Sequence, residues 1–229
     1  MIVLSKCPYR ISLLGGGTDL DWFVKKFGKG LTIGFSINSY STIAIKLKKN
    51  KTKGILNYSS REEYQDIQEI SHPIIRNCLQ RISLNKSIEL SSFGDDLSGG
   101  GLGSSSSFSV ALIKGLSQIQ EKKISNFDAA HLASEIEIKD CKNPIGRQDQ
   151  YMCSLGGINI LEFGESGKVN PIKIQKIEDC IASFVENLFL VDTGIKRSAF
   201  KKLTEIKNES DSYNLILNIY KLTEKFIDD

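Results

Sequence analysis

The stretch LSGGGLGSSSSFSVALIKGL, residues 97–116, joins a loop of glycines and serines to a segment with helical periodicity. A strand-like segment, SIELSSF at residues 87–93, precedes the loop, so regular structure is expected on both sides of it. Within the loop, Leu102 is an apolar residue for which a flexible linker has no use. The apolar positions that follow share one helical face: Phe108, Ala111, Leu112, Leu116 and Ile119.

A loop of this kind can hold a phosphate at the start of a helix. Glycines let backbone N–H groups approach an anion closely, and the first helical turn adds free N–H donors and a partial positive charge. Serine hydroxyls add further donors, or oxygen ligands for a magnesium ion. The predicted cradle consists of Gly99, Gly100, Gly101, Leu102, Gly103, Ser104, Ser105 and Ser106. The alternative is a glycine-rich turn that only caps the helix.

The loop differs from two common nucleotide-binding motifs. A Walker A loop needs a lysine after its last glycine, but Ser104 follows Gly103. The dinucleotide fingerprint needs a βαβ repeat and an acidic residue about 20 positions further on, and both are missing.

The composition is that of an ordinary globular protein, with 229 residues, 40% of them hydrophobic and 25% charged. No apolar run reaches the roughly 18–20 residues that cross a membrane, and the N-terminus lacks the layout of a signal peptide. We therefore expect a cytoplasmic protein without a membrane partner. The net charge of +3 is too small and dispersed to favour nucleic acid. Five cysteines without C-x-x-C spacing and two histidines offer little for a metal site or a histidine base.

Blocks of strands followed by helices predict an α+β fold, with helices packed on antiparallel hairpins. The expected strands cover residues 2–14 with an interruption at Pro8, and residues 30–48, 87–93, 157–163, 167–174 and 183–194. The expected helices cover residues 21–27, 72–82, 104–122 and 125–141, one that opens within 143–157, and two over 196–229. Residues 61–70 are expected to be helix or loop, and residues 46–54 a solvated hairpin loop.

Three segments, in their usual order, resemble the GHMP kinases, the family of galacto-, homoserine, mevalonate and phosphomevalonate kinases. GGGLGSSSSFSVAL resembles the G-L-G-S-S-[AS] phosphate-binding motif, and CPYRISLLGGGTDL resembles the N-terminal motif of the sugar kinases. EIEIKDCKNPIGRQDQYMCSLGG resembles the acidic helix and the catalytic aspartate segment. The R-I-x-x-x-G-G-G-T-D-L form, GRQDQY and FLVDTGIKRSAF are most similar to the D-glycero-D-manno-heptose 7-phosphate kinase branch.

The resemblance implies a GHMP kinase fold. Residues 1–182 would form the N-terminal ATP-binding domain, which is like domain 2 of ribosomal protein S5, and residues 183–229 the start of an α/β C-terminal domain. The family's third motif is a second glycine-rich loop near the C-terminus, and no such loop follows Gly194. We therefore expect the sequence to stop partway through the second domain.

The implied activity is ATP-dependent phosphorylation of the anomeric hydroxyl of D-glycero-D-manno-heptose 7-phosphate to the 1,7-bisphosphate. This reaction would supply nucleotide-activated heptose for capsule, lipopolysaccharide or S-layer glycan synthesis. The implied cofactors are ATP and Mg²⁺, and the partners are small molecules. The oligomeric state stays open, with a homodimer as one expectation. The alternatives are a kinase of a free hexose, of the fucose or galactose type, and a non-catalytic sugar or nucleotide sensor on the same fold.

Phosphoryl transfer needs positioning and charge neutralisation, and the family likeness distributes these roles. Asp149 would be the catalytic base, or would orient the sugar hydroxyl, and Arg10 would be the fixed cation beside it. Ser105 and Glu137 would ligate magnesium, with Glu135 as the second choice for the carboxylate. Two residues apart on a helix, the two glutamates should diverge, so that only one faces the site.

The sugar would bind at the glycine turn, where Asp19 can accept hydrogen bonds from hydroxyl groups. The predicted turn consists of Gly15, Gly16, Gly17, Thr18 and Asp19. The alternative is an ordinary tight turn with a local side-chain hydrogen bond. Arg147 and Arg197, with Lys196, are candidates for a second phosphate on the sugar. Their alternative is plain surface charge.

Overall fold

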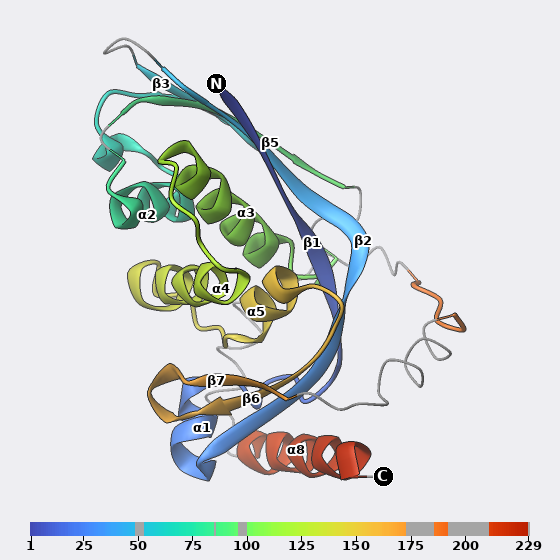
Figure 1. Ribbon diagram of the computed structural model, residues 1–229. Coiled ribbons are helices and arrows are strands. Elements are labelled where there is room, and N and C mark those ends of the chain that lie inside the picture. Colours follow the sequence, from blue (N-terminus) through green and yellow to red (C-terminus); the bar gives the residue numbers. More distant parts are fainter. Residues whose placement is uncertain (49–52, 85, 96–99, 173–185, 192–210, 229) are drawn as a thin grey trace.

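The structure is a computed structural model that describes residues 1–48, 53–84, 86–95, 100–172, 186–191 and 211–228 (Figure 1). Seven strands in these residues form one sheet, in the order β4-β3-β5-β2-β6-β7, and β1 also pairs with β2. Neighbouring strands are antiparallel except β3 and β5. The strands are β1 (Ile2–Leu14), β2 (Lys29–Leu47), β3 (Gly54–Asn57), β4 (Arg61–Tyr64), β5 (Ile88–Gly94), β6 (Ile158–Gly164) and β7 (Val169–Ile172).

The helices gather mainly on one side of this curved sheet, with α2, α3, α4 and α5 stacked against it (Figure 1). They are α1 (Asp21–Phe27), α2 (Pro73–Ile82), α3 (Ser104–Ile119), α4 (Asn126–Glu135), α5 (Gln148–Leu155) and α8 (Ser212–Asp228). Three short turns accompany them: η1 (Ile67–Glu69), the π-helical η2 (Ile136–Asp140) and η3 (Glu165–Gly167). The mixture of one sheet and packed helices confirms the α+β prediction.

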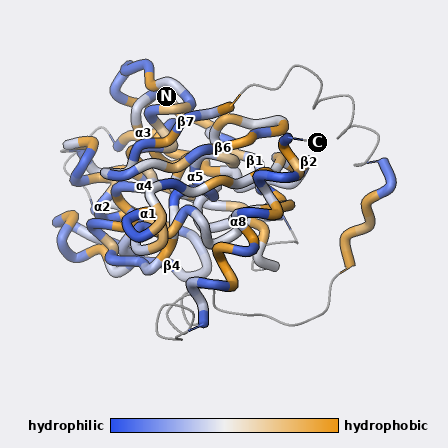
Figure 2. The backbone as a smooth tube through the Cα atoms, turned by 90° about the horizontal axis from the view of Figure 1, so that it is seen from below, coloured by the Kyte–Doolittle hydropathy of each residue, from blue (hydrophilic) through white to orange (hydrophobic). Residues whose placement is uncertain are grey.

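The long strand β2 joins two hydrophobic cores. Ile43 and Ile45 near its C-terminal end pack with buried residues of α2 and α3. Leu31 and Ile33 near its N-terminal end pack instead with α1 and α8. Figure 2 views the molecule from this second end, where hydrophobic and hydrophilic residues alternate along α8. Because α8 packs directly on β2, it forms part of the same body as the sheet, and the predicted division near residue 182 stays a prediction.

The strand and helix predictions hold for α1, β2, α2, β5, α3, β6 and β7, within a few residues at their ends. The predicted interruption at Pro8 is wrong. Strand β1 continues through Pro8, and its pairing with β2 shifts in register between Pro8 and Arg10. Proline fits there because β1 pairs with β2 on one side only, and a strand edge needs no further N–H donor.

Other predictions are wrong in part. Residues 61–70 contain strand β4, an edge strand rich in charge that is anchored by the buried Tyr64, followed by η1. The helix expected over 125–141 ends at Glu135 and continues as the π-helical turn η2. Residues 186–191 form no strand, although one was expected there. The rest of that segment and the first expected C-terminal helix lie mostly outside the described residues.

Candidate active site

The glycine-serine loop meets β1 where α3 begins. Gly103 has a left-handed backbone (φ 73°) that starts the helix, and its carbonyl accepts the first intrahelical bond from the Ser107 N–H at 2.9 Å. The Arg10 N–H donates to the Leu102 carbonyl at 3.0 Å, which fixes the loop to the strand. Of the predicted cradle, residues 100–106 thus form a loop and a helix start, and Gly99 lies outside the described residues.

Arg10 and Asp149 form a bidentate ion pair across 139 residues of sequence. The Arg10 Nε donates to Asp149 Oδ1 at 2.8 Å, and its Nη2 donates to Oδ2 at 2.6 Å. The third nitrogen, Nη1, donates to the carbonyl of Gly101 at 2.8 Å. Only 11% of the arginine side chain is exposed, against 36% for the aspartate. The arginine therefore holds the aspartate in a fixed orientation beside the loop. The catalytic roles expected of the two residues stay a prediction.

Glu137 lies in η2 with 1% of its surface exposed and points at the start of α3. Its Oε2 accepts a hydrogen bond from Ser105 Oγ at 3.3 Å, and its Oε1 accepts one from the Gln150 amide at 3.0 Å. Burial raises the pKa of this carboxyl to about 7. Glu135 diverges as expected, because it pairs with Lys139 and Arg147 instead.

The Ser105 and Glu137 side chains fit a magnesium ion in their chemistry. A hydroxyl oxygen and a carboxylate oxygen lie within 3.3 Å of each other, and hard oxygen donors are what Mg²⁺ prefers. No group of three or more His, Cys, Asp or Glu side chains gathers anywhere in the described part of the chain. A magnesium ion held here would have Ser105 and Glu137 as ligands, and phosphate oxygens and water would complete its coordination.

The glycine turn holds Asp19 at the N-terminal end of α5. The Thr18 hydroxyl is fully buried and lies 2.8 Å from both the Gly15 and the Leu31 carbonyls, to which its one hydrogen can be donated. It also accepts the Leu31 N–H at 2.9 Å, so it fastens the turn to β2. Asp19 Oδ2 accepts the N–H of Gln148 at 2.9 Å. Burial raises the pKa of Asp19 to about 6. A side chain at Gly146 would clash with Asp19, because a Cβ there would lie 1.9 Å from Oδ2.

A cavity of about 380 Å³ opens in front of these groups. Its polar end is formed by Arg10, Asp19 and Asp149, together with the glycine turn at Gly16 and Gly17. Its apolar wall comes from Leu20, Ile145, and the α8 residues Leu215, Ile216 and Ile219. The α8 residues belong to no motif, so sequence reasoning could not assign them to the cavity.

Arg147, one of the cations predicted to bind a second phosphate, does not line this cavity. Arg147 has 4% of its surface exposed, and its guanidinium pairs with Asp21 and, at 3.8 Å, with Glu135. It is absent from the cavity lining. Lys196 and Arg197 lie outside the described residues. The role of these three residues in binding phosphate stays a prediction.

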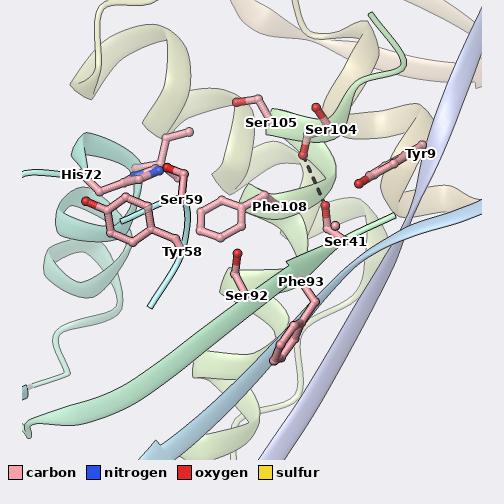
Figure 3. Close-up of a pocket in the computed structure, with 12 residues that line it drawn as sticks. Tyr9, Ser41, Tyr58, Ser59, His72, Ser92, Phe93, Ser104, Ser105 and Phe108 are labelled. Atoms are coloured by element: carbon pink, nitrogen blue, oxygen red, sulfur yellow. Dashed lines mark hydrogen bonds between the residues drawn. The ribbon is translucent and has the colours of Figure 1, made fainter. Parts of the chain in front are cut away.

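A second cavity of about 470 Å³ lies beside the first turn of α3 (Figure 3). Its lining combines serine and aromatic side chains: Ser41, Ser59, Ser92, Ser104, Ser105, Tyr9, Tyr58, His72, Phe93 and Phe108. The His72 ring stands 4.9 Å from that of Tyr58 and 5.4 Å from that of Phe108. Burial lowers the pKa of His72, so its ring is neutral near pH 7. These aromatics come from separate elements, so sequence reasoning did not single them out.

Comparison with known proteins finds a matching sequence family and similar solved structures. Residues 64–157 match the sequence family described as GHMP kinases N terminal domain. The matched segment runs from the end of β4 to just past α5. The chain is 30% identical over 214 residues to the D-glycero-alpha-D-manno-heptose 7-phosphate kinase of Campylobacter jejuni, in an alignment that covers 86% of this chain and 61% of that protein. The chain thus spans about three fifths of the length of this relative.

Solved structures share the fold of the described chain. A D-glycero-D-manno-heptose 1-phosphate kinase from Bacteroides thetaiotaomicron has a TM-score of 0.68 at 24% identity, over 98% of this chain and 79% of its own. A putative sugar kinase from Campylobacter jejuni has a TM-score of 0.64 at 26% identity, over 97% of this chain and 74% of its own. None of the helices in the described residues is long and apolar enough to cross a membrane.

Proposed function

We propose that the protein is an ATP-dependent sugar kinase that phosphorylates the anomeric hydroxyl of D-glycero-D-manno-heptose 7-phosphate to the 1,7-bisphosphate. The observation that carries the proposal is the Arg10–Asp149 pair, which lines the cavity of about 380 Å³ and contacts the glycine-serine loop at Gly101. The named relative supports heptose 7-phosphate as the acceptor. The product would feed the synthesis of nucleotide-activated heptose for surface glycans.

The nucleotide would occupy the cavity beside α3. The aromatic rings of Tyr58, His72 and Phe108 offer flat surfaces for the base, and the phosphates would lie against the loop and the first turn of the helix. Ser105 and Glu137 would hold Mg²⁺ at this end. When bound, the ion neutralises charge on the phosphate oxygens.

The sugar would occupy the cavity lined by Arg10, Asp19 and Asp149. Its anomeric oxygen attacks the γ-phosphorus, the bond to the bridging oxygen breaks, and ADP leaves. Asp149 accepts the hydroxyl proton or orients that hydroxyl, and Asp19 accepts hydrogen bonds from other hydroxyl groups. Arg10 keeps Asp149 in place and offsets negative charge that develops near the loop.

One observation favours a second candidate acceptor. Within the described residues, Arg10 is the only cation that lines the sugar cavity, and it is already paired with Asp149. A free hexose needs no further cation, whereas a sugar phosphate needs one from outside these residues. A kinase of an unphosphorylated hexose is therefore the alternative that the test has to separate.

The test measures transfer of radiolabelled phosphate from ATP to heptose 7-phosphate, heptose, fucose and galactose. We expect turnover of heptose 7-phosphate, and we expect Asp149→Asn to lower kcat by about 100- to 10,000-fold because the proton acceptor is lost. Asp140→Asn is the matched control. It breaks a second bidentate pair, with Arg81, that lies outside both cavities, and it should leave kcat unchanged.

Turnover of a free hexose but not of heptose 7-phosphate would show that the proposed acceptor is wrong and that a free hexose takes its place. Binding of ATP without transfer to any sugar would contradict the kinase proposal and indicate a sensor. A nearly unchanged kcat in Asp149→Asn would show that another group accepts the proton.

A further inference from the structure

Tyr9 is a fully buried tyrosine whose hydroxyl has no hydrogen-bond partner among the described residues. It lies in β1 immediately before Arg10 and lines the cavity beside α3. Figure 3 shows the hydroxyl pointing into that cavity, toward Ser41 and Ser104. The nearby Ser41 hydroxyl is itself engaged, because it donates to the Ser104 carbonyl at 3.4 Å.

The other buried tyrosines of the described chain satisfy their hydroxyls. The hydroxyl of Tyr64 accepts the Ile88 N–H at 3.2 Å, and that of Tyr220 donates to Glu224 at 3.0 Å. The hydroxyl of Tyr151 lies 3.2 Å from His131 Nδ1. A buried polar group without a partner costs free energy, and phenylalanine in place of Tyr9 would avoid that cost. The Tyr9 hydroxyl therefore indicates a partner that is not part of the protein.

The surroundings of the hydroxyl define the chemistry of that partner. The same cavity is lined by Ser104 and Ser105, the first two residues of the 16-residue helix α3. The start of a helix of this length favours an anion, because its first N–H groups lack intrahelical partners and its dipole is positive there. A phenol is a good hydrogen-bond donor to an anionic oxygen.

We propose that the Tyr9 hydroxyl donates a hydrogen bond to a phosphate oxygen of the nucleotide held at the start of α3. This inference rests on the proposed kinase function and adds a binding residue to it. Tyr9 and Arg10, neighbours in the sequence, then contribute to different cavities. Tyr9 reaches the nucleotide cavity, and Arg10 reaches Asp149 in the sugar cavity.

The test is titration calorimetry of wild type and Tyr9→Phe with MgADP, a non-hydrolysable MgATP analogue and adenosine. A hydrogen bond to a charged group predicts about 10- to 100-fold weaker binding of both nucleotides in Tyr9→Phe, with adenosine unaffected. The melting temperature of the free variant should equal or exceed that of wild type, because the lost hydroxyl had no protein partner.

Tyr64→Phe is the matched control. It removes a buried hydroxyl that does have a protein partner and lies outside the cavity, so it should lower the melting temperature and leave nucleotide affinity unchanged. Equal nucleotide affinity in wild type and Tyr9→Phe would overturn the inference and leave the kinase proposal standing. An equal loss for adenosine would place the hydroxyl at the nucleoside and overturn the assignment to phosphate. Absence of nucleotide binding by wild type would overturn both proposals.

Discussion

Asp19 is a carboxylate that the fold buries against the backbone of Gly146 and the N–H of Gln148. The GGGTDL stretch predicted a polar turn, but its burial depends on α5, which follows more than 100 residues later in the chain. Burial raises the pKa of Asp19 from 3.8 to about 6, because little water is left to solvate the charge. Burying an ionised carboxylate beside Asp149 costs free energy, which indicates that Asp19 has a use in the site.

The raised pKa of Asp19 predicts a pH-dependent penalty on stability. Between about pH 4 and 6 the folded protein retains a proton that the unfolded chain has lost, so stability falls as the pH rises and the full penalty remains above pH 6. Asp19→Asn keeps the shape and the acceptor for the Gln148 N–H. It should raise the free energy of unfolding by about 1–3 kcal/mol at pH 7.5, and the gain should disappear near pH 4.

Urea denaturation across this pH range measures the effect. Glu165→Gln, which neutralises an exposed carboxylate, is the control and should show no comparable pH dependence. A gain for Asp19→Asn that is the same at pH 4 and pH 7.5 would contradict the explanation by burial.

Among the elements, periodicity predicted those that carry a clear apolar face. Helix α2 is an example, since it buries Ile74, Ile75, Cys78 and Leu79 on one face. The C-terminal part of β2 is another, since Ser41, Ile43 and Ile45 alternate with less buried residues. Strand β4 was not predicted, because three of its four residues are charged and only Tyr64 enters the core. The π-helical turn η2 was missed for a similar reason. In a π-helix each hydrogen bond spans one residue more than in an α-helix, and this difference does not change the helical pattern of apolar residues in so short a turn.

The attachment of helix α3 to β1 positions the start of the helix next to Arg10, which lies in β1. The buried Ser107 hydroxyl donates to the Cys7 carbonyl at 2.7 Å and joins the two elements. Ser107→Ala removes the donor from this buried contact and should lower the free energy of unfolding by about 1–2 kcal/mol in urea denaturation. Ser117→Ala at the other end of the same helix, where the described residues show no side-chain hydrogen bond, should change it by less than about 0.5 kcal/mol. If Ser107→Ala and Ser117→Ala changed the free energy of unfolding equally, the change would reflect helix propensity and not the hydrogen bond to Cys7.

At the scale of the whole molecule, the candidate site is assembled from β1, α3, η2 and α5. Charge, composition and spacing could not have placed Arg10, Ser105, Glu137 and Asp149 together, and only the likeness of three segments to one family did so. The same likeness gave no information on the apolar wall from α8, or on the partners that keep Arg147 out of the sugar cavity. Such contacts arise from tertiary packing between residues that share no motif.

The packing of α8 predicts that the described body unfolds as one unit. Ile216 and Tyr220 are almost fully buried against Leu20, Phe23 and Ile33. Ile216→Ala should lower the free energy of unfolding by about 2–5 kcal/mol, in a single urea transition seen equally by circular dichroism and tryptophan fluorescence. Trp22, the one tryptophan, packs against this same core and reports on it.

Leu222→Ala is the matched control, because Leu222 lies on the same helix with 62% of its surface exposed. This change should alter stability by less than about 0.5 kcal/mol. If α8 belonged to a separate cooperative unit, as the predicted division near residue 182 implies, Ile216→Ala would shift only a minor transition and leave the main one in place. The two probes would then disagree, since α8 is one helix among many in circular dichroism, whereas Trp22 lies beside it.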